Sequence, residues 1–285
     1  MRALLEEHWE VTCIVRKESR PTAHSWYRHV RCIVYDGSCE SLVRSGEFSD
    51  CDIVVFHLAS MASYHCPNDK IGEMIASNVT FGAHLLEAMH HWGAINLVNT
   101  GTFWQFDQVR QYKPVSLYAA TKEAFEDIVA YYVLRDTVRC TTLILFDVYG
   151  PNDPRKKILP LLNERARTGE RLALSPGMQK MDMVYIADVV AAFKAAAARL
   201  LTGGVRSNSL ERYAVSSRVR VTLKELVATY EQVMGMTLNI EWGGINYRER
   251  EVMEPWQPTK GDNLPGWRPQ YDLLGGLTAI KETTA

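Results

Sequence analysis

Several features that would assign this 285-residue sequence to a broad class are scarce or missing. It has 18 glycines, yet none precedes Gly37. Neither charge is in excess, with 32 basic and 33 acidic side chains, which argues against nucleic acid or an anionic membrane as a general partner. No apolar run is long enough to cross a bilayer, and the amphipathic start, Met1–His8, lacks the apolar core of a signal peptide.

The cysteines also lack a recognisable pattern, because no two of them form a C-x-x-C pair. Several lie inside apolar, strand-like runs, where cysteine acts as a small hydrophobic residue. We therefore expect reduced thiols in a cytoplasmic protein rather than a disulfide framework or a zinc site, and we expect no metal site. The six cysteines are Cys13, Cys32, Cys39, Cys51, Cys66 and Cys140.

What the sequence does contain is an alternation of short apolar, β-branched runs with longer helical patterns. The runs are almost continuously apolar, which indicates burial on both faces, as in a parallel sheet covered by helices. The alternation predicts an α/β fold with a doubly wound parallel sheet. The expected strands are Val11–Val15, Arg31–Tyr35, Asp52–His57, Ala94–Val98, Thr141–Phe146 and Arg212–Val215, and the expected helices lie near residues 70–92, 116–135, 187–202 and 222–235.

The pattern loosens after Gly150-Pro151. Residues 151–182 and 236–285 hold most of the later prolines, glycines and tryptophans. We interpret them as a smaller lobe at the carboxyl ends of the strands, the edge where open α/β sheets bind ligands. The main domain would then be residues 1–150, and residues 151–285 would be mostly substrate lobe, with 183–235 returning to the main domain.

The strongest local signal of chemistry is Tyr118-Ala119-Ala120-Thr121-Lys122. On a helix, Tyr118 and Lys122 would share one face. A free phenol is too weak an acid to act as a base near neutral pH, but a nearby cation lowers its pKa. The pair could then exchange a proton with a substrate hydroxyl or ketone. Alone, this spacing would favour a mere surface contact between the two side chains.

A second segment changes that weighting. Eighteen residues before Tyr118, the expected strand gives way to Asn99-Thr100-Gly101-Thr102-Phe103-Trp104. Together the two segments resemble the extended short-chain dehydrogenase/reductase family, Rossmann-fold enzymes that act on nucleotide-linked sugars. The resemblance implies a triad in which Thr100 joins Tyr118 and Lys122, with Thr102 as the second choice for the hydroxyl. It also implies that residues 1–150 form a dinucleotide-binding, Rossmann-like domain.

Further segments match the family's motifs in the same order. The resemblance implies that Asp36 bonds the cofactor's adenine, that His57-Leu58-Ala59 lines the cofactor site and that Asn78 supports the active site. Each segment alone fits an ordinary strand end, turn or helix cap, whereas their joint order does not. The remaining matches are Asp147-Val148-Tyr149-Gly150-Pro151, Val184–Val189 and Gly266-Trp267-Arg268-Pro269.

The sequence departs from the family's pattern where the substrate's phosphates would be held. Asp147 stands where the family usually has asparagine, Phe146 where an arginine often precedes it, and Met181 near another frequent arginine. Arg248 is a candidate replacement because a guanidinium suits phosphate oxygens, although a solvated charged loop would explain it too. We expect Thr102, Asp147 and Arg248 to contact the substrate.

The resemblance implies an NAD(P)-dependent 4-ketoreductase or epimerase that acts on a nucleotide-diphosphate sugar. Such an enzyme would take part in the biosynthesis of a deoxysugar or a surface polysaccharide. We expect a homodimer. Lys122 would also hold the nicotinamide ribose. Arg16 stands at the end of the second family strand, where an acid usually selects NAD, so NADP is favoured, although a solvated loop residue is the alternative interpretation. The competing hypothesis is a non-catalytic or truncated family member that does not bind cofactor.

One reaction of the family is excluded by the residues after Thr100. Sugar 4,6-dehydratases of this family carry an Asp-Glu pair there, since elimination of water needs both an acid and a base. This chain has Gly101 and Thr102 instead, so we expect no 4,6-dehydratase activity.

The family's opening strand, glycine-rich turn and half of a helix, roughly 20 residues, have no counterpart in the sequence. Arg2–Glu7 looks like the second half of that helix. The turn's backbone amides normally bind the cofactor's pyrophosphate, and the strand lies mid-sheet in the usual order. We therefore expect the chain as given to bind NAD(P) poorly and to be marginally stable, and upstream residues to restore both properties.

Overall fold

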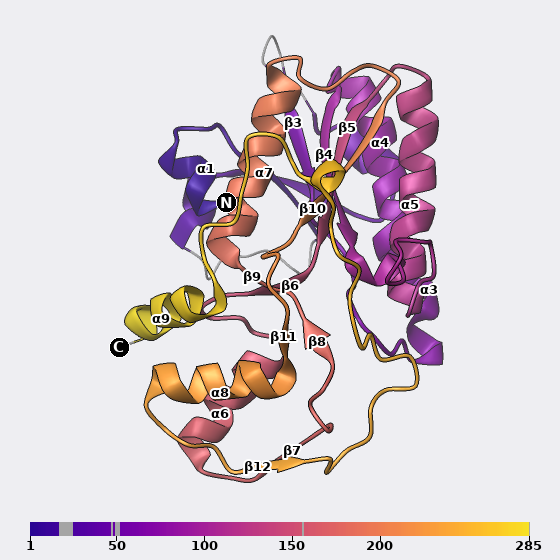
Figure 1. The fold of residues 1–285 in the computed structure, drawn as a ribbon. Coiled ribbons are helices and arrows are strands. Elements are labelled where there is room, and N and C mark those ends of the chain that lie inside the picture. The colour runs from indigo at the N-terminus through magenta and orange to yellow at the C-terminus, as the bar shows by residue number, and fades with distance from the viewer. Residues whose placement is uncertain (17–24, 47, 49–51, 156, 285) are drawn as a thin grey trace. The chain divides into compact units, whose positions relative to one another are not determined.

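The computed structural model describes residues 1–16, 25–46, 48, 52–155 and 157–284, which form two compact units (Figure 1). Unit 1 comprises Met1–Asn99, Thr121–Thr141 and Ala197–Glu211, and unit 2 comprises Thr100–Ala120, Thr142–Ala196 and Arg212–Ala285. The bounds of the two units do not show which residues contact a cofactor or a substrate. The expected division into cofactor domain and substrate lobe therefore stays a prediction.

The strands of the main sheet region follow the apolar runs of the sequence. They are β1 (Thr12–Arg16), β2 (Arg31–Tyr35), β3 (Val54–His57), β4 (Asn96–Thr102), β5 (Arg139–Leu145) and β10 (Leu210–Val215). The expected α/β fold with a parallel sheet is confirmed. One strand end was misplaced, because β4 does not stop at Val98 but continues through Thr102.

Two sheets lie in this region. One has the strand order β10-β5-β4-β3, with β3 parallel to β4. The other consists of β1 and β2 alone, paired in parallel from Thr12↔Arg31 to Arg16↔Tyr35. Within the described part of the chain, no strand joins β1 to β3. What precedes Met1 stays a prediction.

The helices begin and end at residues suited to those positions. In unit 1, the Ser38 hydroxyl accepts the Ser41 N–H at the start of α2, and Gly93 ends α4 in the left-handed conformation that favours glycine. The α-helices are α1 (Arg2–Glu6), α2 (Cys39–Val43), α3 (Ile71–Ile75), α4 (Phe81–Trp92), α5 (Leu117–Leu134), α6 (Ile158–Thr168), α7 (Ile186–Leu201), α8 (Leu223–Met234) and α9 (Leu273–Thr284). Short helices of other types are η2 (Ser25–His29), η3 (Asn68–Lys70), η4 (Ala76–Thr80), η5 (Phe103–Gln105) and η6 (Lys260–Asp262).

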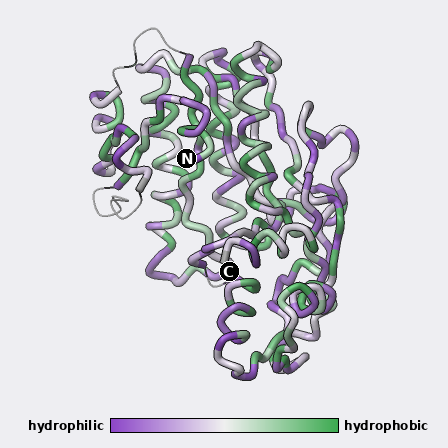
Figure 2. The backbone as a smooth tube through the Cα atoms, turned by 90° about the vertical axis from the view of Figure 1, so that its left-hand side faces the viewer, coloured by the Kyte–Doolittle hydropathy of each residue, from purple (hydrophilic) through white to green (hydrophobic). Residues whose placement is uncertain are grey.

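The hydrophobic core of unit 1 fills the space between the β2–β4 strands and helices α2, α4 and α5. Gly82 lets α4 and α5 approach closely, since a Cβ atom at this position would overlap the ring of Phe125. Along the helices, hydrophobic residues recur between hydrophilic ones (Figure 2), as expected for helices with one buried face. None of the helices described meets the length and hydropathy needed to span a membrane.

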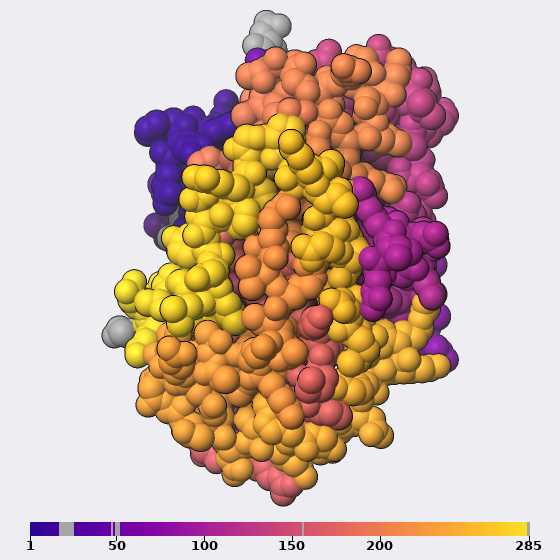
Figure 3. Space-filling model, in the orientation of Figure 1, coloured from indigo at the N-terminus to yellow at the C-terminus, as the bar shows by residue number. Residues whose placement is uncertain are grey.

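Unit 2 has its own core, built from α6, α8 and α9 with small sheets. Its short strands are β6 (Asp147–Tyr149), β7 (Leu172–Leu174), β8 (Lys180–Met181), β9 (Met183–Tyr185), β11 (Val221–Thr222) and β12 (Ile240–Trp242). The β6–β9 and β7–β12 pairs are parallel, and β8–β11 is antiparallel. The C-terminal segment of this unit lies at the surface (yellow in Figure 3).

Candidate active site

Helix α5 carries the tyrosine and the lysine of the predicted triad. The helix starts where the Ser116 hydroxyl accepts the N–H of Ala119 at 3.3 Å, a typical N-terminal cap. Tyr118 therefore lies in the first turn and Lys122 one turn later, on the same face. Tyr118 is half-buried, whereas Lys122 is 1% exposed.

Burial makes Lys122 an unusual lysine. Desolvation lowers its pKa from 10.5 to about 8, and the Glu126 carboxylate, one turn further along α5, partly offsets this by favouring the charged form. The neighbouring imidazole of His57 stays neutral, because burial and then the charge of Lys122 lower its pKa to about 3. His57 Nδ1 donates to Asn99 Oδ1 at 3.1 Å. Unit 1 thus holds a desolvated ammonium that would be charged at neutral pH.

Asn78 connects this part of α5 to the loop after β3. It lies in η4, a π-helical turn between α3 and α4, and such turns are frequent at functional sites. Its amide oxygen accepts the N–H of Met61 at 2.6 Å, and its amide nitrogen donates to the Met61 carbonyl and to Thr121 Oγ1 at 2.9 Å. Asn78 therefore fixes Thr121, the residue before Lys122. Its expected role of supporting the active site stays a prediction.

The two candidate hydroxyls lie on β4, which runs two residues past the first of them. Thr100 and Thr102 are both buried and, being two residues apart on a strand, project to the same face. The Thr102 hydroxyl accepts the N–H of Trp104 at 3.4 Å, while Gln105 Oε1 accepts the N–H of Thr102 at 2.7 Å. This capping box gives Thr102 a structural role at the start of η5. Which of the two hydroxyls takes part in chemistry stays a prediction.

Within unit 2, Tyr118 has an aromatic and a cationic neighbour. Its ring meets that of Trp104 edge to face, with the ring centroids 6.2 Å apart. The guanidinium of Arg155 is held by Asp153 through two hydrogen bonds of 2.7 and 2.6 Å. These bonds are the main cause of a raised Arg155 pKa, and the Tyr118 phenolate contributes as well. Sequence reasoning missed Arg155, whose only signal was an aspartate two residues before it.

Residues 1–207 match the family described as the NAD dependent epimerase/dehydratase family. The chain belongs to this family. A CDP-abequose synthase of Yersinia pseudotuberculosis is 30% identical over 183 residues, which span 64% of this chain and 62% of that enzyme. The CDP-abequose synthase of Salmonella typhimurium LT2 is 24% identical over 283 residues, 98% of this chain and 92% of the enzyme.

Solved structures show the same fold. MoeE5 in complex with UDP-glucuronic acid and NAD superposes with a TM-score of 0.80 at 22% identity, covering 100% of this chain and 94% of that one. The UDP-glucose 4-epimerase of Thermus thermophilus, in complex with NAD, gives 0.79 at 23% identity, covering 99% and 93%. These likenesses confirm the expected Rossmann-like fold of this epimerase/dehydratase family member.

The cofactor residues predicted for this family member lie at the ends of the unit 1 strands. Arg16 is the exposed last residue of β1, and Asp36 directly follows β2. The Asp36 carboxylate accepts the Ser38 N–H and hydroxyl at 2.8 and 2.6 Å, which lowers its pKa. After β3, His57 is buried, while Ala59 is exposed and Leu58 is 60% exposed. Their contact with a cofactor stays a prediction.

The substrate residues predicted in unit 2 include two that influence each other. Asp147 opens β6, and its backbone N–H donates to the Asp182 carbonyl at 3.0 Å. Desolvation raises the pKa of the Asp147 carboxyl to about 6, the cations Lys157 and Arg248 oppose this shift, and the anions Asp182 and Glu251 add to it. Arg248 is exposed. The structure thus brings Asp147 and Arg248 into one charged group.

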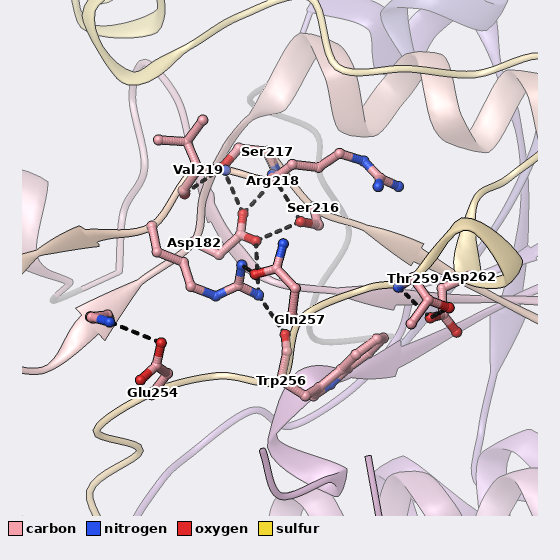
Figure 4. Close-up of polar contacts among 12 residues, drawn as sticks. Asp182, Ser216, Ser217, Arg218, Val219, Glu254, Trp256, Gln257, Thr259 and Asp262 are labelled. Carbon is pink, nitrogen blue, oxygen red and sulfur yellow. Dashed lines mark hydrogen bonds and ion pairs between the residues drawn. The ribbon is translucent and has the colours of Figure 1, made fainter. Parts of the chain in front are cut away.

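A polar network that no local pattern in the sequence predicted holds the centre of unit 2 (Figure 4). Asp182 is 0% exposed, and its carboxylate accepts hydrogen bonds from the Ser216 hydroxyl at 2.5 Å and from the N–H and hydroxyl of Ser217, both at 2.7 Å. Arg220 lies 3.8 Å from this carboxylate and also donates to the Trp256 carbonyl at 2.5 Å. The network joins the turn after β10 to the Trp256 segment.

A second buried carboxylate explains two of the family motifs. Asp188, in the first turn of α7, accepts the N–H groups of Gln270 and Tyr271 at 2.9 and 3.0 Å. Its carbonyl accepts the indole N–H of Trp267 at 3.0 Å. The segments Val184–Val189 and Gly266–Pro269 therefore contact each other within unit 2.

Proposed function

We propose that this family member is an NAD(P)-dependent enzyme that reduces or epimerises a nucleotide-diphosphate sugar at its C4 position. The observation that carries the proposal is the placement of Tyr118 on α5 one turn before a fully buried lysine. Family membership and the two CDP-abequose synthase relatives support it. Those relatives favour synthesis of a deoxysugar for a surface polysaccharide.

In this proposal Tyr118 is the acid/base of the reaction. The Lys122 ammonium would favour the phenolate form of the tyrosine. Thr100 donates a hydrogen bond to the reacting oxygen, and Lys122 also binds the nicotinamide ribose. The bound nicotinamide supplies or accepts the hydride.

The donors and acceptors of unit 1 fit the two ends of a dinucleotide. Asp36 is an exposed, ionised acceptor suited to the adenine amino group, and Lys122 is a cation suited to ribose hydroxyls. The exposed Leu58 and Ala59 offer an apolar surface beside the buried end of β3.

The second candidate is a non-catalytic family member that binds a nucleotide sugar without turning it over. The two candidates differ in cofactor binding and in turnover. The first requires both, whereas the second requires neither.

For the catalytic candidate, we propose NADP as the preferred cofactor. Arg16 is an exposed guanidinium at the end of β1, where it suits a ribose 2′-phosphate. We also propose a cytoplasmic location, which the free thiols of the described cysteines support, and a homodimer, which the exposed Tyr131 and Leu134 on α5 support.

The test is a screen of nucleotide sugars by thermal stabilisation, followed by assay of the stabilising ligand, or its 4-keto form, with NADH and NADPH. We expect stabilisation by a nucleotide sugar and either consumption of the reduced cofactor or conversion to the 4-epimer. Stabilisation with no chemistry in any combination would favour the non-catalytic candidate. No stabilisation by any nucleotide sugar would contradict both candidates.

A further inference from the structure

Asp147 combines a backbone that is fixed by strand pairing with a carboxyl that is only partly exposed. Its N–H donates to the Asp182 carbonyl at 3.0 Å, and β6 pairs with β9 from Asp147↔Met183 to Tyr149↔Tyr185. The position of the side chain is therefore set by two strands. Among the described residues, no side chain or N–H donates a hydrogen bond to its carboxyl oxygens. A half-buried carboxyl in this state favours gaining a proton or a ligand that supplies a donor.

The charges around Asp147 come from three segments of unit 2. Lys157 stands directly before α6, and its ammonium donates to the Val148 carbonyl at 3.4 Å. Arg248 and Glu251 lie in the loop after β12, and Asp182 lies between β8 and β9. Two cations and two other anions thus face the carboxyl. An ionised Asp147 makes three anions against two cations, so an anionic ligand there would meet local repulsion.

We propose that the carboxyl of Asp147 takes up a proton when the pyrophosphate of a nucleotide sugar binds beside Lys157 and Arg248, and that it donates this proton in a hydrogen bond to the ligand. The proposal rests on the proposed function, because it assumes a nucleotide sugar at this site. It deepens that function by coupling substrate binding to pH.

The physical basis is a balance of charge. Desolvation already raises the Asp147 pKa to about 6, and the negative pyrophosphate would raise it further. A protonated carboxyl is a donor, whereas the ionised form only accepts and repels phosphate oxygens. Linkage requires that a ligand which raises a group's pKa binds more tightly when that group is protonated.

The sign of the pH dependence follows directly. Below about pH 6 the carboxyl is protonated with or without ligand, so the affinity is flat. Above that pH the free protein loses the proton and must regain it on binding. The affinity then falls by up to tenfold per pH unit, the limit for a single coupled proton.

The test is calorimetric titration of the full chain with UDP-glucose and CDP-glucose from pH 5.5 to 8. Both pyrophosphates are esterified at each end, so their charge is constant in this range. We expect a decline in affinity above about pH 6 and uptake of up to one proton per ligand, read from heats in buffers of different ionisation enthalpy. This measurement needs no variant, so it is independent of any folding defect.

Variants locate the proton. Asp147→Asn keeps a donor without a titratable proton, so it should bind with an affinity that does not vary with pH and is similar to that of the wild type at pH 5.5. Asp147→Ala should also lose the pH dependence but bind more weakly. Glu249→Gln, an exposed carboxylate next to Arg248, is the matched control and should keep the wild-type profile.

The outcomes separate the two proposals. Binding without proton uptake, or a pH dependence retained in Asp147→Asn, overturns this inference and leaves the proposed function standing. Absence of binding to any nucleotide sugar at every pH overturns both.

Discussion

Each unit of this protein buries a charged side chain, and the two charges are held in different ways. In unit 2, Asp182 accepts three hydrogen bonds from Ser216 and Ser217, and Arg220 lies 3.8 Å away. In unit 1, the charged form of Lys122 is favoured by the Glu126 carboxylate, against a desolvation that lowers the lysine pKa to about 8. Desolvation is the largest influence on both pKa values, raising that of Asp182 and lowering that of Lys122.

The difference indicates two uses of a buried charge. Hydrogen bonds from a turn and a nearby arginine make Asp182 a structural connection between segments far apart in the sequence. A desolvated ammonium near a tyrosine position on the same helix is suited to chemistry, because its charge acts in a medium that screens it poorly. The two residues should therefore respond in opposite ways to substitution, with Asp182 affecting stability and Lys122 affecting turnover.

The largest expected effect concerns Tyr118, the proposed acid/base. Tyr118→Phe removes the proposed acid/base while keeping the ring packed against Trp104. In a form of the protein that binds cofactor, we expect the turnover of Tyr118→Phe to be about 10³-fold lower than that of the wild type, or lower still. The thermal unfolding midpoint should be nearly unchanged. Tyr131→Phe, on the same helix and exposed, is the control. If Tyr118→Phe kept near wild-type turnover, the proposed catalytic roles of Tyr118 and Lys122 would be wrong.

Substitution of the structural anion, Asp182, should instead destabilise the protein. Asp182→Ala leaves the donors of Ser216 and Ser217 unsatisfied in a buried site and removes the partner of Arg220. We expect a loss of about 3–5 kcal/mol in the free energy of unfolding, measured with urea. Glu40→Gln, which breaks an exposed pair with Arg44, should cost less than about 1 kcal/mol. Similar losses in the two variants would show that the Asp182 network contributes little.

The buried Lys122 side chain should lower the stability of the protein, whereas the Asp182 side chain should raise it. The pKa of Lys122 falls from 10.5 to about 8 on folding, so the unfolded chain binds more protons between these values and stability rises with pH across that window. Below about pH 8 the penalty of burying the charge is fully present and corresponds to about 3 kcal/mol.

Lys122→Met should therefore be more stable than the wild type at pH 7, by up to about 3 kcal/mol, and the advantage should vanish as the pH approaches 10.5. The same variant should lose turnover. Urea titrations of both proteins from pH 7 to 10.5 measure the difference, so that titrations common to both proteins cancel. A variant that is less stable at pH 7 would mean that the ammonium contributes to the fold as Asp182 does.

The sequence predicted the elements of the fold better than their ends. Apolar runs identified the strands, because residues buried on both faces of a sheet must be apolar. The strand β4 was cut short because Asn99, Thr100 and Gly101 interrupt the apolar run, and asparagine and glycine are weak strand formers. In the structure β4 continues through these residues, and the last β3–β4 register pair is His57↔Asn99. The π-helical turn around Asn78 carries no comparable signal in the residue pattern.

The candidate site was predictable where chemistry depends on spacing and not where it depends on tertiary contacts. That Tyr118 and Lys122 share one face of α5 follows from helical periodicity, whereas their proposed role needed the family resemblance. Asp182 and Arg220 lie on either side of α7 and β10, so no local pattern joins them. The capping role of Thr102 was also missed, although a threonine three residues before Gln105 is a capping-box pattern.

The smallest expected effect concerns Arg16, an exposed charge of unit 1. Its effect can be compared with those of the two buried charges, Asp182 and Lys122. Arg16 ends β1 and is exposed, so its contact with a ribose 2′-phosphate would be partly screened by solvent. Arg16→Asp replaces the attraction with a repulsion and offers an acceptor to a free 2′-hydroxyl. We expect NADPH affinity to fall about tenfold, roughly 1.4 kcal/mol, while NADH affinity changes less or improves. Fluorescence titrations with both cofactors measure the ratio of the two affinities. The variant Arg44→Asp, at an exposed position directly after α2, controls for net charge. If Arg16→Asp weakens NADH and NADPH equally, Arg16 does not read the 2′-position, and the basis for NADP preference is lost while the roles of Tyr118 and Lys122 stand.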